Sequence, residues 1–175
     1  MIVPMLLALA APIAAPEAAP ERLAFAPVHS VMHVALDREG EIASCTIDAQ
    51  GTVAQDFTEG ACEAFQEFGI LSLLLGGDRN RISAASIVVD MGPAGLSASS
   101  AAPGGLKLAG IDADYAVAPD GRLTRCVVTR RQGLAMGLID LCEMAFASGQ
   151  QFEPGSGDRR GTISLSVYGE LRPGA

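Results

Sequence analysis

The feature that most constrains this chain is an internal repeat marked by a glycine and two cysteines in each copy. Moving the sequence along itself by 81 positions brings the first set of residues onto the second. The matched positions are Gly40 and Gly121, Ile42 and Leu123, Cys45 and Cys126. A second cysteine follows in each copy, at Cys62 and at Cys142. Self-similarity of this kind indicates one supersecondary unit used twice.

Each copy shows the same order of hydrophobic patterns. Two alternating segments flank a turn that ends in Gly40 or Gly121, which is typical of a β-hairpin. A segment of helical periodicity and a final β-rich run follow. The expected strands are 31–36, 42–47 and 82–89 in the first copy and 111–117, 123–129 and 162–171 in the second, with helices at 58–68 and 138–147. The remaining strand of each copy falls in the segment after the helix, at 70–75 and at 150–154. The sequence therefore predicts an α+β protein of two tandem ββαββ modules, each an antiparallel sheet with one helix packed on it.

The predicted modules span residues 22–91 and 106–172. Between them, residues 92–105 consist almost entirely of Gly, Pro, Ala and Ser, apart from Leu96, and this composition is typical of a flexible linker. Residues 1–19 contain Glu17 as their only charged side chain, together with an apolar run and an Ala-Leu-Ala triplet. We interpret this leader as a probable secretory signal peptide; a frayed Ala/Pro-rich tail or a misplaced start codon are the alternatives.

The four cysteines allow three pairings, and the repeat favours Cys45 with Cys62 and Cys126 with Cys142. Each disulfide would tie the second strand of a hairpin to the following helix and would stabilise the module by about 3 kcal/mol. Free buried thiols are the alternative, and a redox role is disfavoured because the sequence has no Cys-x-x-Cys motif. Disulfides require an oxidising compartment, which agrees with an exported protein.

The charge and length exclude several classes of function. A net charge of −8 argues against nucleic acid as the main partner. The charge is uneven, because residues 22–91 carry ten acidic residues and four arginines, whereas residues 106–175 carry eight acidic and eight basic residues. No stretch reaches the roughly 18–20 apolar residues that a membrane span requires, so we expect no stable membrane span.

The sequence offers little catalytic chemistry. His29 and His33 are four residues apart and would share one face of a strand, but a metal site needs further ligands, so we expect them to be spectators. No nucleophile elbow or phosphate-binding loop occurs, and we predict no enzyme activity, no metal and no cofactor. The basic pairs Arg130-Arg131 and Arg159-Arg160 are either solvated loop ends or a possible docking patch for an acidic partner.

The second copy resembles the C-terminal domain of TonB-type energy transducers, in its disulfide-containing version. The resemblance covers roughly residues 110–171, and the first copy is a degenerate version of it. The matching residues are Asp120-Gly121, Arg122 to Val128 around Cys126, Gly133, Ile139 to Cys142, Gln151 to Pro154, and Gly161. This resemblance implies a periplasmic domain of a Gram-negative envelope that docks on extended segments, such as the TonB box of outer-membrane receptors, by strand pairing.

We therefore expect a soluble periplasmic interaction module that binds an extended, TonB-box-like peptide of an envelope protein at a sheet edge. A working transducer is not expected, because the chain shows no inner-membrane helix or long Pro-rich spacer. An envelope enzyme or an enzyme inhibitor is one alternative, and a loss of activity on replacing His29 or His33 would support it. A structural protein whose first module merely packs on the second is another. The partner, the oligomeric state and the module that binds stay open at this point.

Overall fold

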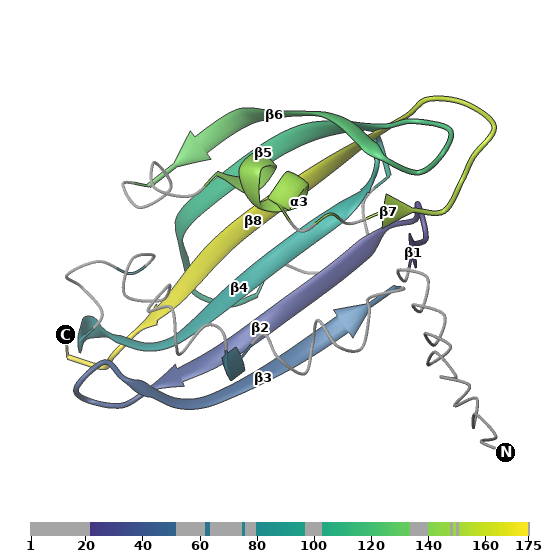
Figure 1. The fold of residues 1–175 in the computed structure, drawn as a ribbon. Coiled ribbons are helices and arrows are strands. Elements are labelled where there is room, and N and C mark those ends of the chain that lie inside the picture. The colour runs from purple at the N-terminus through teal and green to yellow at the C-terminus, as the bar shows by residue number, and fades with distance from the viewer. Residues whose placement is uncertain are drawn as a thin grey trace, which may run out of the picture.

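The computed structural model describes residues 22–51, 62–63, 75, 80–96, 103–133, 140–147, 149 and 151–174. In this part of the chain the fold is mostly β, with eight strands and one short helix. The elements are β1 Arg22–Leu23, β2 Val28–Leu36, β3 Ile42–Gln50, β4 Ile82–Pro93, β5 Leu106–Val117, β6 Leu123–Gln132, α3 Leu141–Ala147, β7 Gln151–Phe152 and β8 Arg159–Leu171. Six of the strands form one antiparallel sheet in the order β3-β2-β4-β8-β5-β6, and β1 pairs with β7 in a small parallel sheet (Figure 1).

The two predicted hairpins are confirmed. β2 pairs with β3 and β5 pairs with β6, each antiparallel and each joined through a turn that contains the repeated glycine. Gly40 and Gly121 have φ angles of 80° and 92°, a left-handed backbone that other residues rarely adopt. At Gly121 a side chain would also collide with the backbone carbonyl of Phe152 on β7. The glycines of the repeat are therefore required by the turn geometry.

The prediction of two separate ββαββ modules is wrong. The last long strand of each half, β4 and β8, pairs with the other across the middle of the molecule, from Ile82 opposite Leu171 to Pro93 opposite Gly161. This pairing, here called the seam, merges three strands from each half into a single sheet. The alternating pattern of a strand fixes which face is buried but does not specify its neighbour, so the sequence could not distinguish one continuous sheet from two.

The hydrophobic core also belongs to both halves. Its main cluster combines Met32 and Val34 of the first half with Ile111 and Val167 of the second, and these side chains are almost completely buried. A second cluster centres on Tyr115, Val117 and Phe152 and includes Leu23 and Phe25 from the beginning of the described chain. Because each cluster draws on both halves, neither half could bury its apolar surface alone in this arrangement.

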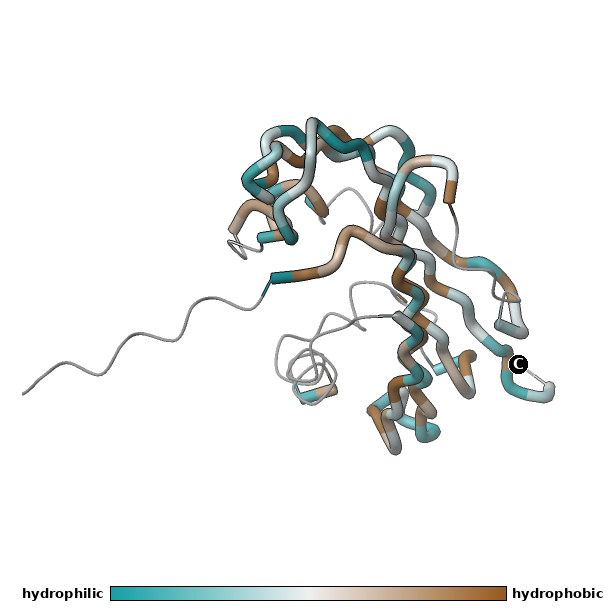
Figure 2. Tube along the Cα trace, turned by 90° about the vertical axis from the view of Figure 1, so that its right-hand side faces the viewer, coloured by the Kyte–Doolittle hydropathy of each residue, from teal (hydrophilic) through white to brown (hydrophobic). Residues whose placement is uncertain are grey.

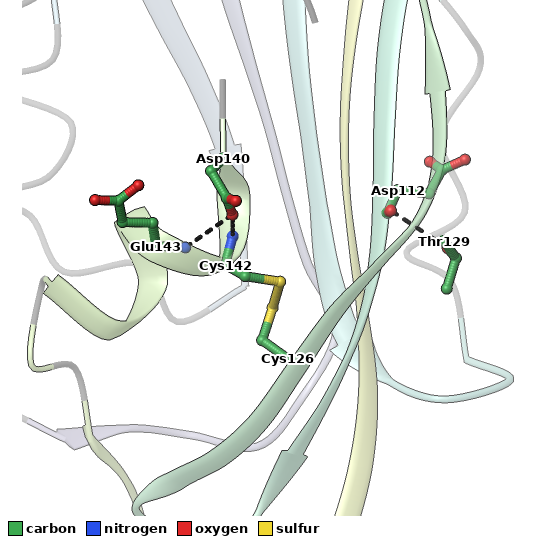
Figure 3. The surroundings of a disulfide bond; sticks show 6 residues. All are labelled: Asp112, Cys126, Thr129, Asp140, Cys142 and Glu143. Carbon is green, nitrogen blue, oxygen red and sulfur yellow. Dashed lines mark hydrogen bonds between the residues drawn. A yellow bond between two sulfur atoms is a disulfide. The ribbon is translucent and has the colours of Figure 1, made fainter. Parts of the chain in front are cut away.

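Both predicted disulfides are confirmed. Cys45 is bonded to Cys62, and Cys126 of β6 is bonded to Cys142 of α3. Asp140 caps the helix, since its carboxylate accepts hydrogen bonds from the backbone N–H groups of Cys142 and Glu143 at 2.9 and 3.0 Å (Figure 3). The second disulfide thus holds a capped but very short helix against the sheet.

Some of the predicted features lie outside the described residues. These are the leader 1–19, most of the helix expected at 58–68, residues 70–74, residues 97–102 of the expected linker, and residues 138–139 of the second expected helix. Gly92 and Pro93, at the beginning of that linker, belong to β4. The module boundaries at 91 and 106 and the signal peptide stay predictions. No helix in the described ranges is long and apolar enough to cross a membrane.

Replacing Cys126 and Cys142 with Ser should lower the free energy of unfolding by about 3 kcal/mol, because the disulfide closes a short loop and restricts the unfolded chain. The Cys45 and Cys62 pair encloses a loop of nearly equal length, with sequence separations of 17 and 16 residues for the two bonds, and serves as the matched comparison. Denaturant titrations with and without reductant measure the effect. Unchanged stability of the wild-type protein on reduction would contradict this prediction.

Gly161→Ala should destabilise the sheet by roughly 1–3 kcal/mol through overpacking. Gly161 lies opposite Tyr115 in the β5–β8 register, and an added Cβ would overlap the Tyr115 ring and lie 2.7 Å from the Gly92 carbonyl oxygen. Gly157→Ala is the control, since no atom lies within 4 Å of a Cβ built there. Thermal unfolding of both variants measures the difference; equal melting temperatures would show that Tyr115 moves aside at no cost.

Candidate functional site

The six-stranded sheet has two chemically different faces. Successive side chains of a strand point to opposite sides of the sheet, and hydrophilic and hydrophobic residues follow one another along the strands (Figure 2). On β2, Met32 and Val34 enter the main core, whereas His29, Val31 and His33 point to the opposite side, here called the polar face. The strand registers extend this division across the whole sheet.

A row of polar residues crosses the polar face, with one residue from each of the six strands. In register order the polar row is Gln50, His29, Asp90, Ser164, Asp112 and Arg130. It joins both halves, because the seam places Asp90 of β4 opposite Ser164 of β8. The row is the largest set of polar side chains that the sheet topology brings together among the described residues.

His29 and Asp90 form the strongest polar contact of this row. His29 Nδ1 lies 2.7 Å from an Asp90 carboxylate oxygen, and the two side chains are 5% and 40% exposed. A buried histidine held by a carboxylate is also found in serine hydrolases. In the row, however, Ser164 of β8 lies next to Asp90 of β4, and β4 separates Ser164 from His29. These three residues therefore do not form a Ser-His-Asp relay.

His33 makes separate contacts from the same face. Its Nδ1 is 3.2 Å from Ser86 Oγ, and its Nε2 is 3.5 Å from an Asp48 carboxylate oxygen in an exposed setting. This side chain lines a shallow depression, together with Ser44, Thr46 and Glu170. The two histidines thus share a face, but each has its own partners. No group of three metal-binding side chains occurs within the described ranges.

The four arginines of the expected docking patch lie in two places. Arg130 and Arg131 are exposed at the end of β6, whereas Arg159 and Arg160 begin β8. Four to six positions along β5 separate the residues that pair with the two sets, which corresponds to roughly 13–20 Å along a strand. Arg159 is also half-buried and packs its guanidinium 4.7 Å from the centre of the Phe25 ring. The structure does not bring the four arginines together into one patch.

Among the described strands, β3 and β6 are the two edges of the sheet. The edges differ in regularity. β3 pairs with β2 without interruption from Ser44 to Gln50, whereas the β5–β6 register shifts twice, at Asp112/Ala113 and at Ala116/Val117. They also differ in charge, since β3 carries Asp48 alone and β6 carries arginines. Irregular, charged edges resist the addition of further strands, so β3 is the more accessible edge.

An aromatic cluster lies at the end of the sheet beside β1 and β7. The Tyr115 and Phe152 rings stack at 5.7 Å, and Phe25 meets both rings edge-on. The Tyr115 hydroxyl donates to the Gly92 carbonyl at 3.4 Å. Burial raises the pKa of Tyr115 to about 12, and the nearby Arg159 charge opposes this rise. The phenol therefore stays neutral under physiological conditions and serves as a packing group.

The chain matches no protein-family model, no curated protein and no solved structure. The resemblance of the second copy to TonB C-terminal domains accordingly stays a prediction that rests on the motif residues alone.

Sequence reasoning missed Asp90 as the partner of His29. A signal for it was present, because His29 and His33 are four residues apart and so are Ser86 and Asp90. Two antiparallel strands with equally spaced polar residues can pair them in one register, and that register is observed. The packing of Phe25 on Arg159 had no comparable signal.

Asp90→Ala should lower the free energy of unfolding by about 2 kcal/mol, because it removes the carboxylate that is hydrogen-bonded to a buried imidazole. Asp114→Ala on β5 is the control, since Asp114 is exposed and also lies in a strand of the sheet. Urea denaturation at neutral pH measures the difference. Equal effects of the two substitutions would show that the His29 contact contributes nothing to stability.

Proposed function

We propose that the protein is a non-catalytic interaction module of the bacterial envelope that binds an extended peptide by strand addition at β3. The observation that carries this proposal is the uninterrupted Ser44–Gln50 register of an edge strand. A peptide that pairs with such an edge gains main-chain hydrogen bonds along its length, and pockets for alternate side chains give specificity.

The side chains of β3 suit a reversible partner. Most of its residues are exposed, and only Cys45 and Ile47 among those from Ser44 to Gln50 pack toward the core. The strand therefore offers backbone groups without the large apolar patch that marks a permanent interface. The disulfide from Cys45 to Cys62 anchors β3 at its centre, so the binding strand is held in place before a peptide arrives.

Charge favours a peptide that is not strongly acidic. Asp48 is 83% exposed and lies within the regular part of β3. Glu41 immediately precedes the strand and is also exposed. Negative charges on an edge attract basic segments and repel acidic ones. The β3 edge thus differs from β6, whose arginines would favour the opposite kind of peptide.

The envelope location rests on several features of the chain. Two disulfides are typical of an oxidising, exported environment. The expected signal peptide in the leader 1–19 and the TonB-like motifs of the second copy support a periplasmic location and a link to TonB-dependent transport. In this proposal the chain shares the recognition mode of TonB domains, not their role in transmitting force.

The proposal predicts that a TonB-box-like peptide shifts the backbone amide resonances of residues 44–50 in the oxidised, full chain, whereas those of β5 remain unchanged. The measurement is an NMR titration. The control is the same peptide with N-methylated alternate amides, which retains its side chains but loses the donors needed for pairing.

Asp48→Lys is the matched variant, because an edge lysine hinders the addition of a strand, and Asp114→Lys is its control on β5. Weaker binding of the first variant alone supports β3 as the edge. Shifts confined to β6, or none in the folded protein at millimolar peptide, would contradict the proposal.

An envelope enzyme or enzyme inhibitor is the second candidate, and the observation that favours it is the buried His29–Asp90 pair. This alternative predicts an activity, or inhibition of an envelope hydrolase, that disappears in His29→Ala and persists in His33→Ala. In this alternative Ser164 is not the nucleophile, because it is next to Asp90 in the polar row and β4 separates it from His29.

A further inference from the structure

The beginning of the described chain is held as an extended segment on the second half of the protein. Residues 22–25, here called the strap, include β1, which pairs in parallel with β7 (Figure 1). The backbone N–H of Glu153 donates to the Leu23 carbonyl at 2.8 Å. The pairing is only two residues long, so backbone hydrogen bonds alone give little affinity.

Phe25 provides the main side-chain contact of the strap. Its ring meets Tyr115 at 6.2 Å and Phe152 at 5.8 Å, both nearly perpendicular. Arg159 covers the ring, with the guanidinium carbon 4.7 Å from the ring centre. Edge-on aromatic pairs and cation–π contacts select an aromatic side chain over an aliphatic one. Leu23 packs against the same cluster.

Arg159 is incompletely satisfied in this arrangement. One terminal N–H donates to the Glu153 carbonyl at 2.6 Å, but the buried Nε has no hydrogen-bond partner in the described part of the chain. A buried donor without an acceptor weakens the complex in which it occurs. The strap, Arg-Leu-Ala-Phe, has no acceptor side chain to offer. The strap therefore packs on Arg159 without supplying a side-chain acceptor for its Nε–H.

The residues that receive the strap come from the second half. Tyr115 lies on β5, Phe152 on β7 and Arg159 on β8, and the strap reaches them from the opposite end of the sequence. These three side chains, with the backbone of residues 151–153, are here called the strap site. A surface formed by one part of a chain and contacted by a segment distant in the sequence, through strand pairing and ring packing, has the features of a peptide-binding site occupied in cis.

We propose that the strap site is a binding site for an extended peptide with an aliphatic residue followed two positions later by an aromatic one, and that residues 22–25 occupy it as an intramolecular competitor. A partner with the Leu-x-Phe pattern binds when the strap detaches. Molecules whose strap site is occupied by the strap cannot bind the partner, so the apparent affinity of the wild-type protein for the partner is lowered. Substitutions that weaken the strap raise this apparent affinity. This site is separate from the β3 edge, so the inference goes beyond the proposed function.

The test uses the full, oxidised chain with Leu23→Ala and Phe25→Ala, and a capped peptide of residues 22–27. The peptide should raise the melting temperature of this variant in a saturable way, because it binds only the folded state. The peptide should bind the wild-type protein with an affinity at least roughly tenfold lower than its affinity for the variant, because the strap competes for the same site. The same peptide with Phe25→Ala should have no effect. No peptide-dependent shift in a variant that retains its circular dichroism and both disulfides would overturn the proposal.

Substitutions in the groove complete the test. Arg159→Ala, added to the strap variant, should abolish the response to the peptide, whereas Arg160→Ala, its exposed neighbour, should leave it unchanged. Amide shifts must fall on residues 151–153; shifts on 44–50 instead would overturn the strap site and support the β3 edge. If the double strap variant does not fold, Phe25→Leu alone is used, since it retains apolar volume but loses the aromatic contacts, and the same outcomes apply.

Discussion

The pairing of β4 with β8 is the interaction on which the rest of the structure depends. It joins two hairpins that would otherwise be separate ribbons, and it aligns the apolar faces of all six strands on one side. Isolated hairpins are marginally stable in water. With the seam in place, Met32 of one half and Val167 of the other enter a common core, and α3 covers part of it. The polar row exists for the same reason, since its two halves meet at Asp90 and Ser164.

The two halves that the seam joins also differ in structure. Each contributes one edge strand, but the edges have diverged: β3 is regular and mildly acidic, and β6 is irregular and basic. The aromatic groove occurs on the second half, where the strap from the first half reaches it. The two copies of the unit thus differ in the regularity and charge of their edge strands, and only the second copy carries the aromatic cluster on which Phe25 packs.

Local features were predictable from the sequence, and long-range pairing was not. Gly40 and Gly121 mark hairpin turns because their conformation is set by adjacent residues, and the repeat identified both disulfides. The strand that pairs with β4 at the seam belongs to the other half of the chain. The alternation of apolar and polar residues along Ile82–Pro93 does not indicate which strand that is. For the same reason His29 was found but Asp90 was not. Arg159 was expected on a surface, because no pattern in the sequence shows that Phe25 returns to cover it.

The contrast between the disulfides and the seam has a consequence for the order of folding. Each disulfide joins residues only 16 or 17 positions apart, and each hairpin closes through a short turn, so these contacts form at a small cost in loop entropy. The seam must bring together strands that are separated along the chain by β5, β6, α3 and β7. Contacts at such separation form slowly. The disulfide of each half can therefore form before β4 pairs with β8. Between these two events, the unpaired edges of β4 and β8 can mispair with other chains.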